Sequence, residues 1–317
     1  MTRKGERIFS LFYLHKFGVW QLTSYICSIN KLKDMFTNQL QRKVEYSIEL
    51  LRKCEDMALR MDAENGFYLA FSGGEDSQAL YHIAQMAGVK FKAHMNLTSV
   101  DPPEVIRFVK QNYPDVELIK PKMSIYDMAK KKGMLPTRMI RWCCAEFKEM
   151  SGARKVTLIG IRHAESKRRS KRNEIETGDR KFSGNFDQWS EHQEKMVTCV
   201  GGKDKILVSP IIHWTEKDVW EFLNVQNIPH CSLYDNGYTR IGCICCPMSS
   251  RNPKIKEMRD FPHVQRNWES TIQWLMQNKW TKKQQLKSKD LAFKWWISGK
   301  SFDEFYAEEV LQQKIEF

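Results

Sequence analysis

The segment at residues 68–81, YLAFSGGEDSQALY, constrains the fold of this chain more than any other stretch. A short apolar run ends at Phe71, two adjacent glycines follow, and helix-like spacing of apolar residues resumes after Ser77. This order predicts a buried strand over GFYLAF, a tight turn, and a helix over SQALYHIAQMAG that ends at Gly88. Glycines at such a turn let an anion approach the main chain, and the first turn of a helix offers free N–H groups. The segment therefore predicts an anion-binding turn, although an ordinary strand-to-helix turn uses the same residue types.

Alternating strand and helix signals continue along the chain. Further apolar runs predict strands over FKAHMNLTS, VELIK, KVTLIGI and KILVSPII, and helical spacing predicts helices over residues 40–61 and EVIRFVKQNY. Strands that alternate with helices indicate an α/β fold, with a mostly parallel twisted sheet and helices on both faces. Residues 162–199 are polar and basic, and we expect a long active-site loop there.

Length and hydropathy limit the domain organisation. The 317 residues can form one α/β domain and an appendage. We expect an N-terminal extension at residues 1–34, the α/β domain at residues 35–250, and a small helical region at residues 251–317. Residues 8–29 are apolar but are interrupted by polar and charged side chains, which argues against a membrane span, and no secretory cleavage site follows. We therefore expect a cytoplasmic protein without a membrane partner.

Charge and cysteine content narrow the partners. The formal net charge of +13 favours polyanions such as nucleotides, nucleic acid or an acidic protein. A Lys- and Trp-rich C-terminal region fits this chemistry, because cations engage phosphates and aromatic rings stack on bases. The same tryptophans are also typical of a helical core; they are Trp268, Trp274, Trp280, Trp295 and Trp296. Nine cysteines in a chain of this length do not indicate a disulfide scaffold, and their grouping indicates metal or redox chemistry in a reducing compartment.

The string SGGEDS resembles the PP-loop of the ATP pyrophosphatase superfamily, which has the adenine nucleotide α-hydrolase-like fold. It lacks the Gly-Lys-Ser/Thr ending of a Walker P-loop and the spacing of a dinucleotide-binding turn. From the residues alone, Asp76 is placed either to cap the helix or to help hold a Mg²⁺ that bridges phosphates. The resemblance implies that the loop binds an adenine nucleotide: ATP, or the sulfonucleotides APS or PAPS. The implied binding residues are Ser72, Gly73, Gly74, Glu75, Asp76 and Ser77.

Two later stretches extend the resemblance over roughly residues 68–248. GIRHAESKRRS is similar to an element of the PAPS reductase family that begins at Gly160 and includes Arg162 and Ser166. The guanidinium of Arg162 is suited to bidentate binding of phosphate or sulfate. SPIIHWTEKDVWEFLNVQNIPHCSLYDNGYTRIGCICCP is similar to the second half of that family, and its Arg240 is an implied binding residue. Part of this stretch is structural, because Thr215 is a good helix N-cap.

Two cysteine pairs predict a metal centre. Cys143 and Cys144 in one loop and Cys243 and Cys246 in another supply four thiolates, which suit tetrahedral Zn²⁺ or an iron–sulfur cluster. Free structural thiols are the remaining alternative. The resemblance to 4Fe-4S members of the PAPS reductase family implies a cluster on these four residues, with Lys148 at the position of the family's lysine. Cys245 has no role in this arrangement.

One departure from the family separates two functions. Sulfonucleotide reductases carry a nucleophilic cysteine near the C-terminus, whereas this sequence has no cysteine after Cys246. The family's Asp-Thr-Gly segment is replaced by LTSVDPPE. Asp101 and Glu104 in this stretch either bind a metal or the substrate, or are acidic residues at the start of a helix. We therefore expect adenylation by ATP, with Asp76, Ser77 and Arg162 catalytic, as in the Dnd- and Ssp-type DNA phosphorothioation proteins that the chain also resembles.

The partners expected for adenylation are an adenine nucleotide, DNA or tRNA as acceptor, a cysteine desulfurase or other sulfur donor, and a second copy in a homodimer. The alternative enzyme is an APS or PAPS reductase that takes its nucleophile from Cys245, Cys231 or a partner. The alternative from another class is a non-catalytic nucleotide-binding protein.

Overall fold

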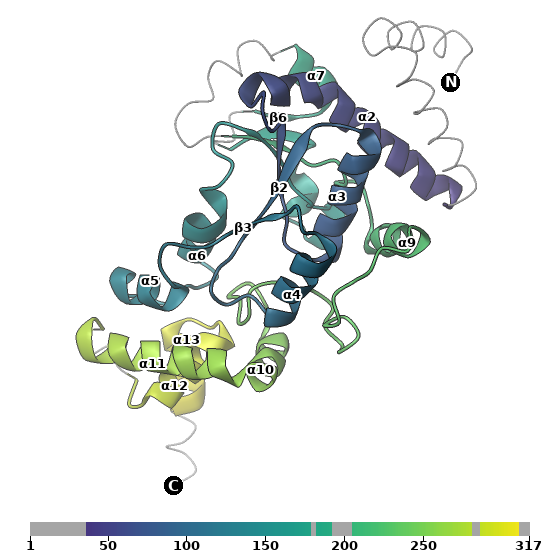
Figure 1. The fold of residues 1–317 in the computed structure, drawn as a ribbon. Helices are drawn as coiled ribbons and strands as arrows, with labels where there is room; N and C mark the ends of the chain where they lie inside the picture. The colour runs from purple at the N-terminus through teal and green to yellow at the C-terminus, as the bar shows by residue number, and fades with distance from the viewer. Residues whose placement is uncertain (1–35, 179–181, 192–204, 281–285, 311–317) are drawn as a thin grey trace, which may run out of the picture. The chain divides into compact units, whose positions relative to one another are not determined.

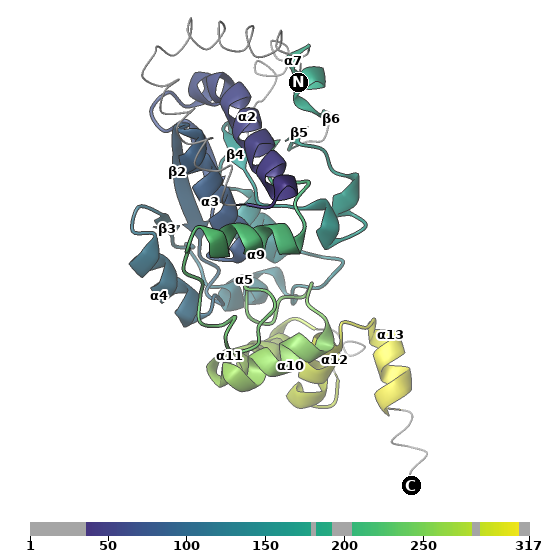
Figure 2. The same ribbon diagram turned by 90° about the vertical axis from the view of Figure 1, so that its right-hand side faces the viewer.

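The strands of the computed structural model belong to one sheet. The structure describes residues 36–178, 182–191, 205–280 and 286–310, so the predicted extension at 1–34 lies outside the described residues. The strand order is β3 (Glu117–Ile119), β2 (Phe91–Asn96), β1 (Phe67–Ala70), β4 (Val156–Leu158), β7 (Ile206–Val208), β5 (Ile175–Thr177) and β6 (Ser183–Gly184). Figures 1 and 2 label β2, β3 and β6 in two views of the ribbon. β1, β4 and β7 are parallel neighbours, as are β2 and β3, whereas β5 runs antiparallel to β7 and β6. The predicted mostly parallel α/β class is confirmed.

The chain divides into two compact units, which are described separately. Unit 1 comprises the described residues before residue 71 together with residues 75–92 and 154–229. Its elements are α2 (Asn38–Met61), β1 (Phe67–Ala70), α3 (Glu75–Ala87), β4 (Val156–Leu158), β5 (Ile175–Thr177), β6 (Ser183–Gly184), α7 (Phe186–Ser190), β7 (Ile206–Val208) and α9 (Glu216–Val225). β4 lies between β1 and β7, and α3 packs against both α2 and α9.

Local sequence explains where the helices of unit 1 begin. The hydroxyl of Thr37 accepts the N–H of Leu40 and caps α2, whose apolar face is buried. Thr215 and Asp218 form the reciprocal capping box of α9, as the sequence predicted. Asp218 also pairs with Lys43 of α2 at 2.5 Å, so one carboxylate both starts α9 and ties it to α2.

The prediction of a continuous loop over residues 162–199 is wrong for part of that range. β5 and β6 form an antiparallel pair there, and α7 follows with Asn185 as its N-cap. These strands are three and two residues long, too short to leave a periodic signal in the sequence. Residues 192–199 lie outside the described residues.

Unit 2 comprises residues 71–74, 93–153 and the described residues from 230 onward. Its elements are β2 (Phe91–Asn96, which begins in unit 1), α4 (Pro103–Asn112), β3 (Glu117–Ile119), α5 (Ile125–Lys132), α6 (Trp142–Cys144), η1 (Ala145–Glu149), α10 (Arg251–Asp260), α11 (Pro262–Asn278), α12 (Lys289–Ser298), α13 (Phe302–Phe305) and η4 (Tyr306–Val310). Short 3-10 turns η2 (His163–Glu165) and η3 (Arg169–Lys171) belong to unit 1.

The helices of residues 251–310 share an aromatic core within unit 2. α11 packs against α5 and α12. Trp268 and Trp296 are buried with ring centroids 4.7 Å apart, so for these two tryptophans the core interpretation is confirmed. Among the described residues, no helix is long and apolar enough to cross a membrane.

Candidate functional site

The glycine loop follows β1 and leads directly into α3, as the sequence predicted. Gly73 has a positive φ of 76°, and a Cβ there would lie 2.8 Å from Val105 Cγ1 and 2.9 Å from Val109 Cγ2 on α4. Only glycine therefore fits this position without displacing α4. Ser72 is exposed in the loop, while Ser77 is buried in the first turn of α3.

A buried ion pair occupies the start of α3 in unit 1. Arg162, which follows β4, donates its Nε–H to Asp76 Oδ1 at 2.6 Å, and its Nη2 lies 3.5 Å from Oδ2. Only 6% of the Arg162 side chain and 16% of the Asp76 side chain are exposed. Glu165 accepts the backbone N–H of Arg162 at 2.9 Å and fixes the turn that carries the arginine. The structure therefore brings together two of the three predicted catalytic residues.

The environment of Asp76 makes its carboxyl weakly acidic. Burial raises the pKa of Asp76 to about 7, and the neighbouring Glu75 carboxylate adds to the rise, while Arg162 opposes it. Glu75 is itself buried in the first turn of α3. A cation beside these two carboxylates is needed before the helix start can accept an anion, and Arg162 supplies one charge.

Gly160 allows the end of β4 to approach α3 closely. A Cβ on Gly160 would lie 3.0 Å from the carbonyl oxygen of Asp76 and 3.1 Å from its carbonyl carbon. The glycine predicted as a binding residue therefore positions Asp76 through backbone packing. Ser166 is exposed, and its hydroxyl accepts the N–H of Arg169, so it caps a turn. Arg240 is exposed in unit 2.

Four thiols influence one another in unit 2. A hydrogen bond with Cys144, burial, and the charges of Cys144, Cys243 and Cys246 all raise the pKa of Cys143. The opposite holds for Cys144, whose pKa is lowered to about 5 by the bond with Cys143 and by the Arg141 guanidinium. Arg141 Nη2 donates to Cys144 Sγ at 3.2 Å. The four cysteines that the sequence singled out are therefore electrostatic neighbours.

Polar groups surround Cys243. The hydroxyl of Thr98 lies 3.4 Å from Cys243 Sγ and donates to Asp101 Oδ1 at 3.0 Å. The charges of Cys243 and Asp101 raise the pKa of Lys148, so this lysine remains cationic beside the thiols. Asp101 thus orders the loop after β2, and Glu104 in the first turn of α4 pairs with Arg107.

The loop between Cys243 and Cys246 is anchored at two backbone positions. Ile244 N–H donates to the Val100 carbonyl at 2.7 Å. Cys245 has a left-handed backbone with φ of 58°, and its N–H donates to Glu257 Oε2 at 2.6 Å. Cys245, which had no role in the sequence interpretation, is buried and forms the turn that places its two neighbours.

The chemistry of the side chains around the four cysteines fits an iron–sulfur cluster. It offers four thiols, a thiolate stabilised at Cys144, and two cations, Arg141 and Lys148, that offset the charge of a thiolate-bound group. None of the described cysteines forms a disulfide. In the described part of the chain, no group of three or more His, Cys, Asp or Glu side chains is arranged to hold a single metal ion.

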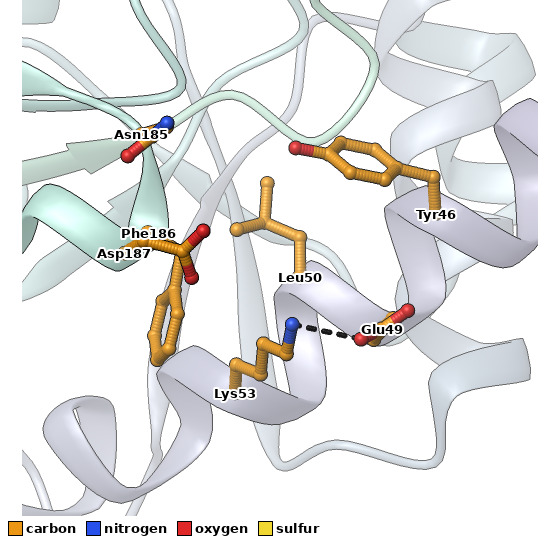
Figure 3. A pocket seen from close by; sticks show the side chains of 7 residues that line it. All are labelled: Tyr46, Glu49, Leu50, Lys53, Asn185, Phe186 and Asp187. Carbon is orange, nitrogen blue, oxygen red and sulfur yellow. Dashed lines mark ion pairs between the residues drawn. The ribbon is translucent and has the colours of Figure 1, made fainter. Parts of the chain in front are cut away.

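A separate hollow in unit 1 contains none of the predicted site residues (Figure 3). Its lining residues come from α2 and from the region of α7; they are Tyr46, Glu49, Leu50, Lys53, Asn185, Phe186 and Asp187. Lys53 pairs with Glu49 at 2.7 Å and lies 5.6 Å from the centre of the Phe186 ring. The charge of Lys53 is therefore accounted for by the packing of α7 on α2, without a ligand.

Sequence reasoning missed two residues of the cysteine site. Arg141 stands two positions before Cys143, so a basic residue flanking the cysteine pair was a signal that the sequence offered. Thr98 is 145 residues from Cys243, and no spacing in the sequence reveals their contact.

Comparison with known proteins is consistent with these features. The family model for the phosphoadenosine phosphosulfate reductase domain matches residues 66–249, more than half of the chain. The chain therefore belongs to the phosphoadenosine phosphosulfate reductase domain family.

Individual relatives are more distant. An adenosine 5'-phosphosulfate reductase of Oceanobacillus iheyensis is 32% identical over 152 residues, which cover 45% of this chain and 54% of that protein. An uncharacterized protein of Methanocaldococcus jannaschii is 25% identical over 218 residues, covering 64% of this chain and 41% of the relative. The chain thus spans about half the length of these relatives. Among solved structures, Candida glabrata FMN adenylyltransferase in complex with FMN and an ATP analogue is 16% identical in sequence, with a TM-score of 0.45. The match covers 70% of this chain and 71% of the adenylyltransferase chain.

Proposed function

We propose that the protein is an ATP pyrophosphatase that adenylates a substrate and so prepares it for sulfur transfer. The observation that carries this proposal is the buried pair of Arg162 and Asp76 at the first turn of the helix after the glycine loop. A carboxylate held by arginine at a helix N-terminus suits a nucleotide whose phosphates are bridged by Mg²⁺.

Each residue of this site has a role in the proposed reaction. Main-chain N–H groups at Gly73 and Gly74 and the hydroxyl of Ser72 bind the polyphosphate. Asp76, once ionised, helps hold Mg²⁺, and Ser77 donates from the first turn of α3. Arg162 keeps Asp76 in position and offsets charge on the leaving group. Roles for Glu75, Ser166 and Arg240 in nucleotide binding remain part of the proposal.

The reaction itself is a displacement at phosphorus. A substrate oxygen forms a bond to the α-phosphorus of ATP, the bond from that phosphorus to the bridging oxygen breaks, and pyrophosphate leaves with the electron pair. A sulfur nucleophile then displaces the adenylated oxygen, and AMP leaves. Positioning and charge stabilisation at the phosphates account for most of the catalysis expected in such a step.

The four cysteines complete the proposal. Cys143, Cys144, Cys243 and Cys246 would hold a 4Fe-4S cluster, which when bound supplies redox-active iron and sulfide. Arg141 and Lys148 offset the negative charge that four thiolates bring.

Nucleic acid is the proposed acceptor, as in DNA phosphorothioation, with tRNA as the other candidate. The formal net charge of +13 supports a polyanionic substrate. The adenylate donor, a sulfur source such as a cysteine desulfurase, a homodimer and a cytoplasmic location belong to the same proposal.

Reduction of APS or PAPS is a second candidate, because relatives in the matched family are named adenosine 5'-phosphosulfate reductases. Sulfonucleotide reduction needs an accessible thiolate as nucleophile. Cys231 and Cys245 are both buried, and burial raises the pKa of each thiol, so neither is suited to that role.

A pyrophosphate-release assay on anaerobically purified full chain tests the proposal. ATP is supplied with Mg²⁺ and with DNA, with tRNA, or with neither. Release of pyrophosphate and AMP should require nucleic acid and should fall at least a hundredfold in Asp76→Asn, while Arg169→Gln retains it. Sulfite release from APS or PAPS with a thiol donor would instead establish the reductase. Nucleotide binding with neither product would establish a non-catalytic binding protein.

A further inference from the structure

A small recess in unit 2 lies beside the cysteine loop, since Pro247, the residue after Cys246, forms part of its wall. Three cationic side chains line the recess: Arg138, Lys254 and Lys300. No carboxylate belongs to its lining among the described residues. A concave surface with only positive charge selects for an anion.

Lys254 is the most unusual of these cations. It lies in α10, and only 3% of the residue is exposed. Its Nζ makes one long hydrogen bond, 3.4 Å to the Ile297 carbonyl, and it forms no ion pair with any described residue. An ammonium group has three donors, and burying donors without hydrogen-bond acceptors is costly. Glu257, the nearby carboxylate on α10, accepts the N–H of Cys245.

Of the other polar groups in the wall of the recess, Arg138 has donors left over, whereas Trp296 and Lys300 are already bonded. Arg138 uses Nη2 to bind the Met248 carbonyl at 3.1 Å, which leaves most of its fork available. Trp296 donates its indole N–H to Pro136 at 2.7 Å. The indole N–H of Trp295 is buried without a hydrogen-bond partner in the described part of the chain. Lys300 pairs with Glu308 at the outer end.

We propose that this recess is a second anion site, which binds the tetrahedral oxyanion of a phosphate or sulfate group through Lys254 and Arg138, with Lys300 at the rim and Trp295 and Trp296 in the wall. The oxyanion supplies the hydrogen-bond acceptors that Lys254 and Arg138 lack. Its source is either a free inorganic anion or a phosphodiester of a nucleic acid. The inference does not depend on the proposed adenylation, because it stands on unit 2 alone.

Fluorine NMR on the full chain, labelled with 5-fluorotryptophan, tests the site directly. Resonances of Trp295 and Trp296 are assigned with Trp295→Phe and Trp296→Phe. The probes are sodium sulfate, inorganic phosphate, and a thymidine hexanucleotide without terminal phosphate, each titrated at constant ionic strength. Local resonances keep binding here distinct from binding at the glycine loop.

We expect saturable shifts of the Trp295 and Trp296 resonances. Lys254→Met should weaken binding at least tenfold, because a charged hydrogen bond is lost. The matched control on the same helix is Lys256→Met, whose exposed ammonium pairs with Asp260 and should not matter. Should Lys254→Met fail to fold, Lys300→Gln at the rim should still weaken binding severalfold.

The probes also separate the two sources. Saturation by sulfate or phosphate at lower concentration than by the hexanucleotide identifies a free oxyanion, and the reverse order identifies a phosphodiester. The proposal is overturned if no probe shifts these resonances, or if the variants at Lys254 and Lys300 bind as the unmodified protein does.

Discussion

Replacement of Arg162 by glutamine should destabilise the protein in a pH-dependent manner. Arg162→Gln removes the charge partner of Asp76 and a hydrogen bond of 2.6 Å, while glutamine keeps much of the side-chain volume. Breaking a fully buried ion pair costs about 3–5 kcal/mol, because it leaves one charge uncompensated. Asp76 limits this cost, because its raised pKa of about 7 lets the carboxyl take up a proton instead.

The magnitude follows from that pKa. Protonation costs about 1.4 kcal/mol for each pH unit above the pKa, and a lost charged hydrogen bond adds about 1–1.5 kcal/mol. We therefore expect a loss of about 2–3 kcal/mol at pH 8. Near pH 6, Asp76 is already largely protonated in the unmodified protein, and the loss should shrink to about 1 kcal/mol.

Urea unfolding followed by circular dichroism at pH 6 and pH 8 measures these losses, since urea leaves ion pairs unscreened. The double variant Asp76→Asn/Arg162→Gln should lose less than the sum of the two single variants. Arg169→Gln is the matched control on the same segment, because Arg169 is 35% exposed and its pair with Glu165 should contribute below about 1 kcal/mol. Equal losses for Arg162→Gln and Arg169→Gln, or a loss that grows toward pH 6, would refute the reasoning.

Three further predictions concern stability and iron content. Because the pKa of Asp76 is raised in the folded protein, the contribution of Asp76 to stability is full below about pH 4 and is lost as pH rises through about 7. Asp76→Asn should therefore make the urea midpoint depend less on pH across that window, and an unchanged pH dependence would contradict the raised pKa. Gly160→Ala should cost about 1–3 kcal/mol in urea unfolding through its 3.0 Å contact with the Asp76 carbonyl, whereas Gly242→Ala, which meets nothing within 4 Å, should cost little. Cys246→Ser should lower iron bound after anaerobic reconstitution, and Cys54→Ala, in unit 1, should not; equal iron in both variants would exclude Cys246 as a ligand.

The sequence predicted the elements of the fold where hydrophobic periodicity is long enough to read. The strand, glycine turn and helix around residues 66–88 are confirmed, and the capping box at Thr215 is present. β5 and β6 were missed because β5 pairs with β7, which is distant in the sequence, and because both strands are too short for alternation to show.

The site was less accessible to sequence reasoning. The sequence predicted a helix cap or a Mg²⁺ ligand at Asp76 and an anion-binding group at Arg162, but their mutual ion pair depends on how β4 meets α3, which no local pattern specifies. The cysteines were predictable because thiol chemistry requires their grouping. Thr98 beside Cys243, and the buried Lys254, depend on tertiary packing alone.

The interleaving of the two units has a practical consequence for dissecting this protein. The polypeptide passes from one unit to the other at residues 70–71, 74–75, 92–93, 153–154 and 229–230. No single cut separates them: a fragment ending at residue 250 would discard α10, α11 and α12 yet retain the half of unit 2 that packs on them. Point substitutions, rather than truncation, are therefore the appropriate means of assigning an activity to unit 1 or to unit 2.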